Sequence, residues 1–148
     1  MLKHKLLHPE ILGALASAGH NSRVLIADGN FPFSTKLGIN ADLVHLNLSP
    51  GIVTCTQALE ALVTAIPVEA AAVMKPARTG QYAMKEDPPI WNEFRKILKD
   101  AGIAVELKQI EVPDFYDLAS SDDVALTIAT GEQRIYANIL ITIGVVFP

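Results

Sequence analysis

Short apolar segments of strand length alternate with segments of helical periodicity along the whole chain. The clearest strand candidate, residues 23–27, continues as Val-Leu-Ile-Ala without polar alternation, which is typical of a strand covered on both faces. Strands that alternate with helices favour a parallel sheet between helical layers. We therefore predict an α/β fold, a three-layer domain on a mixed, mostly parallel sheet. The 148 residues suffice for one such domain, residues 1–148.

The same patterns predict the positions of the individual elements. Apolar residues at helical spacing, with proline and glycine at the ends, predict helices at residues 9–18, 54–65, 90–101 and 113–119. Short apolar or alternating runs predict strands at residues 23–27, 43–48, 68–74, 103–110, 124–129 and 137–145. The last two strands, connected around Gly131, are expected to run antiparallel to each other. Residues 75–89 contain three prolines and a glycine, which predicts a long loop suited to a lid or an oligomer contact.

Charge and hydropathy patterning exclude two classes of partner. Twelve lysines and arginines face 16 aspartates and glutamates, a net charge of −4, and no basic run occurs. Nucleic-acid binding needs a basic surface, so we expect no nucleic-acid partner. No apolar stretch approaches the ~18 residues of a membrane-spanning helix, so we expect no membrane partner either. The first residues imitate a signal peptide, but residues 8–10 (His-Pro-Glu) interrupt the apolar part, which favours a cytoplasmic protein.

The usual signatures of metal and cofactor sites are missing from the sequence. Cys55 is the single cysteine, so neither an internal disulfide nor a multi-cysteine zinc site can form, and we expect a buried, inert thiol. His4, His8 and His45 lack the spacing of metal ligands. The glycine-rich motifs that hold phosphates or dinucleotides do not occur. We therefore expect no metal and no cofactor.

A histidine and an aspartate flank the strand at residues 23–27. His20 follows the first predicted helix, and Asp28 follows the strand, where ligands of α/β folds collect. The strand spans roughly 17 Å, so the two side chains meet only if the loop at His20 folds back or a neighbouring subunit supplies one of them. Each also has a structural interpretation. His20 could be a helix-end histidine that interacts with the dipole, and Asp28 could be a turn former in Asp-Gly-Asn.

A phenol and an amide stand two residues apart at the start of the last predicted strand. Tyr136 and Asn138 would project to the same face, and neutral hydrogen-bonding groups side by side suit a polyhydroxylated ligand. The structural interpretation is a cross-strand aromatic beside a strand-edge amide. Trp91 lies on a strongly apolar helical face and is predicted to be core.

Three separated groups of residues carry a family resemblance. They are residues 9–20, which include Pro-Glu-Ile-Leu and end in Ala-Gly-His, residues 24–32 (Val-Leu-Ile-Ala-Asp-Gly-Asn-Phe-Pro), and residues 130–145 with Thr-Gly-Glu and Tyr-Ala-Asn-Ile-Leu. Together they resemble the ribose pyranase and fucose mutarotase family (RbsD/FucU), in the same order over nearly the whole chain. The resemblance implies an RbsD-like fold and an enzyme that interconverts anomers or ring forms of a free monosaccharide without cofactor or metal.

The resemblance also implies roles for individual residues. His20 looks like the catalytic acid. The residues that would bind the sugar are Asp28, Glu69, Met74, Tyr116, Tyr136, Ala137 and Asn138. Members of the family form ring-like homo-oligomers, often decamers, with the pocket at or near a subunit boundary. An arrangement of that kind would let His20 and Asp28 share one site.

The branch within the family is indicated by the middle of the chain. Residues 73–116 are similar to the fucose mutarotase branch, which implies L-fucose or a related sugar, whereas Tyr136-Ala-Asn138 is closer to the ribose branch. Val112 stands where the fucose branch has an arginine and the ribose branch a histidine. Without that basic group, a non-catalytic sugar-binding module of the same fold is the alternative function, and a plain oligomeric scaffold is a third.

Overall fold

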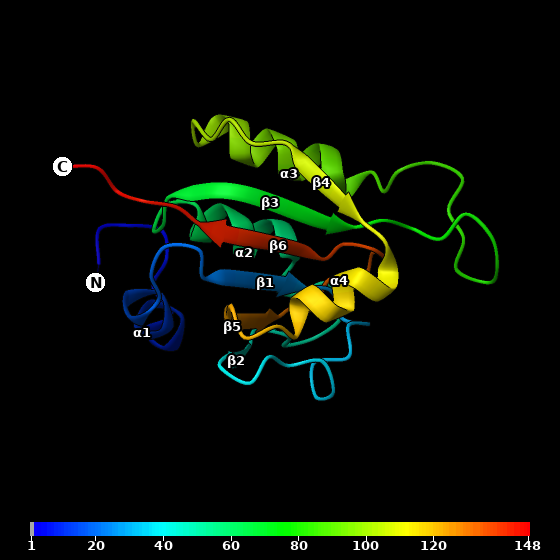
Figure 1. The fold of residues 1–148 in the computed structure, drawn as a ribbon, viewed down its shortest axis with the longest axis horizontal. Coiled ribbons are helices and arrows are strands. Elements are labelled where there is room, and N and C mark those ends of the chain that lie inside the picture. The colour runs from blue at the N-terminus through cyan, green and yellow to red at the C-terminus, as the bar shows by residue number, and fades with distance from the viewer. Residues whose placement is uncertain (1) are drawn as a thin grey trace.

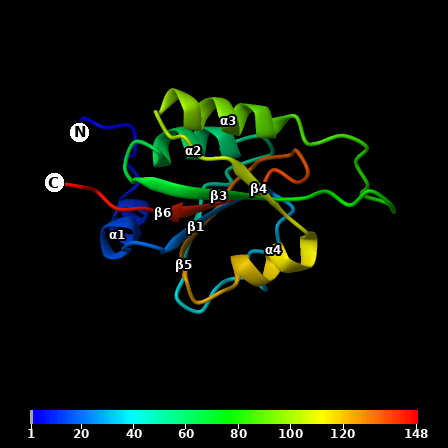
Figure 2. The same ribbon diagram turned by 45° about the horizontal axis from the view of Figure 1, so that its top comes forward.

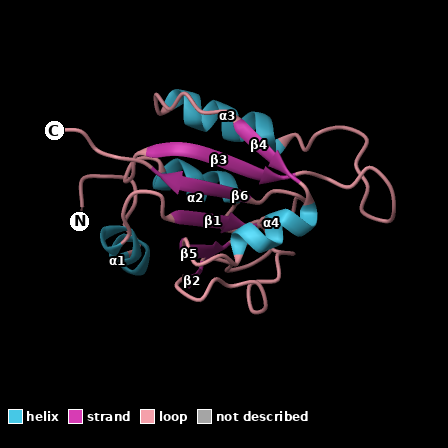
Figure 3. Cartoon of the chain, viewed as in Figure 1, coloured by secondary structure: helices cyan, strands magenta, loops and turns pink. Residues whose placement is uncertain are grey.

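Six strands form one sheet with helices on both faces in the computed structural model, which describes residues 2–148 (Figure 1). The strands are β1 (Arg23–Ala27), β2 (Asp42–His45), β3 (Val68–Met74), β4 (Leu107–Ile110), β5 (Val124–Ala129) and β6 (Ile139–Ile143). The helices are α1 (Pro9–Ser17), α2 (Cys55–Leu62), α3 (Ile90–Asp100) and α4 (Val112–Ala119). The cartoon in Figure 3 shows the three layers of this α/β fold, which confirms the predicted fold class.

The strand order β2-β5-β1-β6-β3-β4 decides which residues can meet. β1 and β2 run parallel to β5, and β4 runs parallel to β3, whereas β6 is antiparallel to both of its neighbours, β1 and β3. Five strands therefore finish at one end of the sheet, here called the carboxyl end, where β6 begins. The opposite end is called the amino end. Ligand sites of α/β folds lie at the carboxyl end.

Two separate cores cover the two faces of the sheet. Because side chains alternate along a strand, Val24 and Ile26 of β1 pack with α1, α2 and α3, while Leu25 and Ala27 pack with α4. Figure 2 shows α2 and α3 above the sheet and α4 below it. Trp91 of α3 is fully buried in the larger core, as predicted. The carboxyl end of β1 is thus held rigidly between two packed layers.

Three features of the backbone differ from the prediction. Residues 103–106 are not a strand, because Gly102 (φ 75°) ends α3 in the left-handed region and the chain pairs with β3 only from Leu107. The last strand begins at Ile139 rather than at residue 137, since Tyr136 has a left-handed φ of 58°. β5 and β6 do run in opposite directions, but β1 lies between them, so they are not paired. Of these differences, the one at Tyr136 lies at the site described below.

Candidate functional site

A cavity of about 420 Å³ opens at the carboxyl end of the sheet. Hydrogen-bonding groups and apolar or aromatic side chains line it together: Asp28, Asn30, Phe31, Met74, Tyr82, Val112, Tyr116, Ile135, Tyr136 and Asn138. A cavity of this size and mixed lining is typical of a small-molecule site. Five of the residues predicted to bind a sugar meet here, although they come from four separate parts of the chain: Asp28, Met74, Tyr116, Tyr136 and Asn138.

Asp28 is the polar centre of the cavity. Its carboxylate is only 2% exposed and accepts three hydrogen bonds, from the Asn30 amide (2.9 Å), the Ala137 amide (3.2 Å) and the Asn138 side chain (3.0 Å). In return, the Asp28 amide donates to Asn138 Oδ1 at 2.8 Å. Burial raises the pKa of the Asp28 carboxyl, and the three donors oppose that rise. The bond to Asn30 is also the turn contact expected of Asp-Gly-Asn, so the turn and cavity interpretations of Asp28 both hold.

The Tyr136 side chain links the cavity to the long loop after β3. Its hydroxyl donates to the Tyr82 carbonyl at 3.0 Å and accepts from the Ala77 amide at 3.4 Å. The left-handed backbone at Tyr136 precedes Ala137, whose amide donates to Asp28. The prediction that Tyr136 and Asn138 share one face of a strand is therefore wrong. Both side chains nevertheless line the cavity. Much of the hydrogen-bonding capacity of the phenol is used by the loop.

One wall of the cavity is apolar and aromatic. Phe31 and Tyr116 lie with ring centroids 5.6 Å apart, and Met74 and Val112 extend the same wall. Burial raises the pKa of the Tyr116 phenol, and the nearby Asp28 carboxyl adds to the rise. Among the described lining residues there is no lysine, arginine or histidine, and the start of α4 contributes the apolar Val112. The cavity is thus suited to an uncharged ligand with both hydroxyl groups and an apolar face.

His20 and Glu69 lie at the other end of the sheet. His20 lies between α1 and β1, Glu69 is in β3, and their side chains meet with Nε2 and Oε2 2.9 Å apart. His20 also borders a second cavity of about 330 Å³, whose polar lining includes Asp42, Asp122 and Asp123. Within one chain, therefore, neither His20 nor Glu69 reaches the cavity that holds Asp28. The loop at His20 does not fold back toward Asp28, so His20 and Asp28 can share a site only if a neighbouring subunit supplies one of them.

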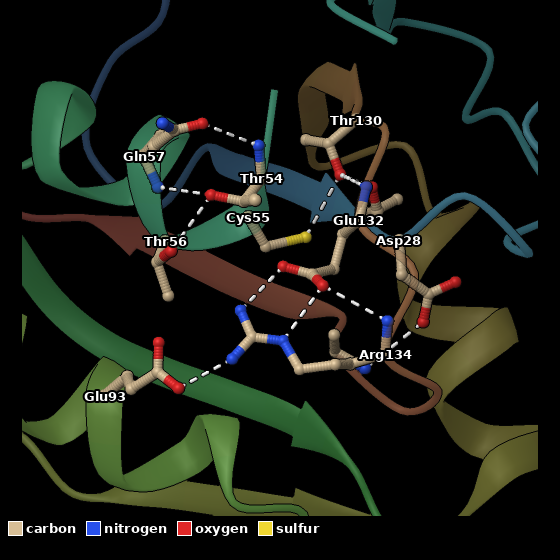
Figure 4. Close-up of polar contacts among 11 residues, drawn as sticks. Asp28, Thr54, Cys55, Thr56, Gln57, Glu93, Thr130, Glu132 and Arg134 are labelled. Carbon is tan, nitrogen blue, oxygen red and sulfur yellow. Dashed lines mark hydrogen bonds and ion pairs between the residues drawn. The ribbon is translucent and has the colours of Figure 1, made fainter. Parts of the chain in front are cut away.

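A network of charged side chains around the buried Glu132 carboxylate supports the segment between β5 and β6. Glu132, only 4% exposed, accepts from Arg134 Nε at 2.9 Å, from its second guanidinium nitrogen at 2.8 Å and from its backbone amide at 3.1 Å (Figure 4). Arg134 also donates to Glu93 of α3 at 2.6 Å. The Glu132 carbonyl accepts from the amide of Gly29, directly after Asp28, at 2.8 Å. The network thereby holds the segment that carries Tyr136 and Asn138 against the end of β1.

Several residues of the site are not among those predicted from the sequence. Asn30 and Phe31 lie two and three residues after Asp28, and Ile135 precedes Tyr136, so their positions close to predicted residues were the available signal. Tyr82 could be suspected only from the length of its loop. The Glu132–Arg134 pair lies in the recognised Thr-Gly-Glu segment, but nothing in its composition indicated that it is buried.

Cys55 provides a simple test of how tightly this region packs. Its side chain is fully buried, its sulfur lies 3.2 Å from Thr130 Oγ1, and burial raises the pKa of the thiol (Figure 4). We expect iodoacetamide to leave the native protein unmodified at mildly alkaline pH and to alkylate it once in urea, because the thiolate is the reactive form. Intact-mass spectrometry reads a single addition, since the chain has one cysteine. Equal labelling of native and unfolded protein would contradict this burial.

The described residues form neither a metal-binding cluster nor a membrane-spanning helix. No group of three or more histidine, cysteine, aspartate or glutamate side chains within residues 2–148 is arranged to hold a metal ion. No helix in that same part of the chain is long and apolar enough to cross a membrane.

Known proteins resemble this chain over almost its whole length. The RbsD / FucU transport protein family matches residues 1–146. Human fucose mutarotase is 32% identical over 95% of this chain and 90% of its own. D-ribose pyranase of Histophilus somni (strain 129Pt) is 28% identical over 99% of this chain and all of its own. The crystal structure of the fucose mutarotase of Streptococcus pneumoniae in complex with L-fucose superposes with a TM-score of 0.81, at 25% identity, covering 99% of this chain and 100% of that one.

Proposed function

This chain belongs to the RbsD / FucU transport protein family, and on that premise we propose that it is a monosaccharide mutarotase. It would interconvert anomers or ring forms of a free sugar, L-fucose or a related sugar, without a cofactor. The observation that carries this function is the cavity at Asp28, where a buried carboxylate–amide pair faces an aromatic wall. The names of the relatives support the reaction, since fucose mutarotases and ribose pyranases are isomerases of free sugars.

The polar side of the cavity retains hydrogen-bonding capacity for sugar hydroxyls. A carboxylate offers about four lone-pair positions, and Asp28 uses three of them within the protein. The Asn138 side-chain nitrogen donates once to Asp28 and keeps its second hydrogen. One free acceptor beside one free donor can bind two neighbouring hydroxyl groups of a ring. Ala137 contributes through its backbone amide, which orients the Asp28 carboxylate.

The apolar side of the cavity suits the C–H face of the sugar. Pyranose rings expose apolar C–H groups on one face, and aromatic side chains such as Tyr116 and Phe31 can pack against them. Met74 and Val112 provide room for a methyl substituent rather than a further polar group. This lining supports a 6-deoxy sugar such as L-fucose over a phosphorylated one, because no cation among the lining residues could pair with a phosphate.

Mutarotation requires one proton donor and one proton acceptor. As the bond from C1 to the ring oxygen breaks, its electron pair stays on the ring oxygen, which takes a proton from an acid, while the anomeric hydroxyl loses its proton to a base. The open-chain aldehyde turns about the C1–C2 bond and closes again by the reverse transfers. A histidine with an ordinary pKa near 6.5 can serve in both directions at neutral pH. We assign the acid role to His20.

This assignment requires a second copy of the chain. His20 and Asp28 lie at opposite ends of β1, so the His20 that serves one cavity must come from a neighbouring subunit. A closed ring in which the amino end of one sheet faces the carboxyl end of the next supplies one histidine per cavity. We propose such a homo-oligomer, a decamer in keeping with the family resemblance.

Exchange NMR on the anomeric protons tests the function directly. The protein is added in catalytic amount to L-fucose, D-ribose, D-galactose and related sugars, and saturation is transferred from one anomer to the other. We expect faster exchange for L-fucose or a close relative than in buffer alone. Binding shifts without faster exchange would favour the non-catalytic sugar-binding module, and no response to any sugar would favour the scaffold.

A further inference from the structure

The contact between His20 and Glu69 points to a role for Glu69 that differs from sugar binding. Nε2 of His20 lies 2.9 Å from Oε2 of Glu69, and within residues 2–148 this is the only side-chain hydrogen bond of the imidazole. We propose that Glu69 is a positioning residue that fixes the tautomer of His20, so that Nδ1 is the nitrogen that exchanges a proton with the sugar. This assignment rests on the proposed mutarotase function and identifies the partner of its acid.

A β-bulge directs Glu69 toward the histidine. Between β3 and β6, Val68 pairs with Ile143 and Ala70 pairs with Thr142, so Glu69 is an extra residue on β3 without a partner on β6. Bulges re-aim side chains and are over-represented next to active sites. Without the extra residue, the alternation of β3 would place this side chain differently relative to the sheet.

The backbone at His20 is equally specialised. Asn21, the next residue, has a left-handed φ of 68°, a conformation that asparagine tolerates better than most residues. Its amide donates to the carbonyl of Ile143 at 2.9 Å, which ties the turn to the end of β6. The turn that presents the imidazole and the bulge that presents the carboxylate are therefore both attached to the same end of β6.

Gly144 leaves the space through which the two side chains meet. β6 lies between β1 and β3, so the contact has to pass the end of that strand. A Cβ atom at position 144 would come within 3.2 Å of Glu69 Cβ and 3.7 Å of its Oε2. The Gly144 amide donates to Pro67 at 2.9 Å, which fixes the glycine beside the bulge. Any larger residue at 144 would crowd Glu69 in its present position.

Stability does not explain these specialisations. The side chains of His20 and Glu69 are 57% and 40% exposed, and exposed ion pairs contribute only about 0–1 kcal/mol to folding. One exposed contact depends on a bulge, a left-handed turn and a glycine. A role of this contact in proton transfer explains them better than its contribution to stability. The other carboxylates around the His20 cavity, those of Asp42, Asp122 and Asp123, make no hydrogen bond to the ring.

The contact determines which nitrogen carries the exchangeable proton. A carboxylate only accepts hydrogen bonds, so the neutral imidazole must keep its hydrogen on Nε2 and leave Nδ1 as a lone pair. In the protonated ring, Nδ1–H gives its proton to the ring oxygen as the C1–O bond breaks, and the bonding electron pair remains on that oxygen. The proton of the anomeric hydroxyl leaves to water. On ring closure the attacking hydroxyl returns the first proton to Nδ1 and the carbonyl oxygen takes a proton back from water, so that no net proton is consumed.

The test combines kinetics with a spectroscopic measurement on Glu69→Ala. ¹⁵N NMR of the histidine rings reports the tautomer, and the His20 signals are assigned by their loss in His20→Ala. We expect the wild-type ring to be mainly Nε2–H and the variant to become a mixture of tautomers. The anomer-exchange rate at saturating sugar should fall about 10- to 100-fold, as for partial loss of general acid–base catalysis, while the dissociation constant of the sugar stays unchanged. The matched control is Asp123→Ala, which should behave as wild type. It removes a carboxylate that lines the same cavity as His20 but leaves the hydrogen bond between His20 and Glu69 in place.

Each other outcome has a definite meaning. An unchanged exchange rate in Glu69→Ala, or a wild-type ring that is already a tautomer mixture, overturns the assignment while the mutarotase function stands. Weaker sugar binding with an unchanged rate at saturation also overturns it, because Glu69 would then contact the sugar, as the family resemblance implies. A wild-type protein that accelerates no sugar overturns the proposed function itself.

Discussion

Replacing His20 by alanine is expected to abolish anomer exchange and to leave the fold intact. General acid–base catalysis is worth roughly 10²–10⁴-fold, and loss of the acid should remove that factor. The side chain is 57% exposed and its one side-chain hydrogen bond is to Glu69, so little packing is lost. Saturation transfer between the anomeric protons measures the rate, and circular dichroism confirms folding. His4→Ala, at another exposed histidine, should retain the wild-type rate.

A mixing experiment shows whether the histidine acts on a neighbouring copy. His20→Ala and Asp28→Asn should each be inactive alone. If they are unfolded together and refolded, about a quarter of the sites in a randomly mixed ring should combine a native His20 with a native Asp28 from different copies. Activity should therefore return. A mixture that remains inactive although both variants fold would show that the two residues do not share a site across subunits.

The position of the carboxyl-end cavity could be predicted, because it depends on a local sequence pattern and on the general topology of α/β sheets. An uninterrupted apolar strand predicts a buried position, and Asp28 directly after it must lie at the end of the sheet where ligands collect. The strand at residues 23–27 and the buried Trp91 were confirmed for the same reason, because hydrophobic periodicity depends on neighbours in the sequence. Met74, at the end of β3, which runs in the same direction as β1 on the far side of β6, reaches the same cavity.

The His20–Glu69 contact could not be foreseen, because it depends on strand order. The two residues are 49 positions apart, and β6, the last strand of the chain, lies between β1 and β3, so the contact has to pass the end of β6. The bulge at Glu69 has no signature in the residues of β3. Tyr136 illustrates a second limit, because its left-handed backbone depends on contacts made by the whole segment after β5 rather than on its own preference.

Removing the guanidinium of Arg134 is expected to have the largest effect on stability. Arg134→Met leaves the Glu132 carboxylate, which is 4% exposed, without its charged partner. Breaking a fully buried ion pair from one side typically costs about 3–5 kcal/mol, and this range is an upper bound here because the Arg134 side chain is 40% exposed. The loss is measured as a shift of the urea midpoint at fixed protein concentration. Glu93→Gln, which weakens only the outer contact of Arg134, should cost far less because that pair is half-exposed.

The pH dependence of the lost stability in Arg134→Met tests whether the unpaired Glu132 carboxylate is its cause. Burial raises the pKa of Glu132, but the hydrogen bonds and charge of Arg134 outweigh burial, so the net pKa lies below its usual 4.5. In the wild type the pair therefore stabilises the fold above that pH, and its contribution is lost as the pH falls through the lowered value. In Arg134→Met the backbone donors to Glu132 remain but the guanidinium is lost, so burial, the largest single influence, raises the pKa and the native state binds a proton more readily than the unfolded chain. The loss of stability should be greatest at neutral pH and should shrink in mild acid.

The double variant Glu132→Gln, Arg134→Met is the control for a buried charge. It should recover part of the lost stability at neutral pH, because no charge is then buried. A loss of stability that is independent of pH and is not relieved in the double variant would instead assign the effect to lost packing around the Arg134 side chain.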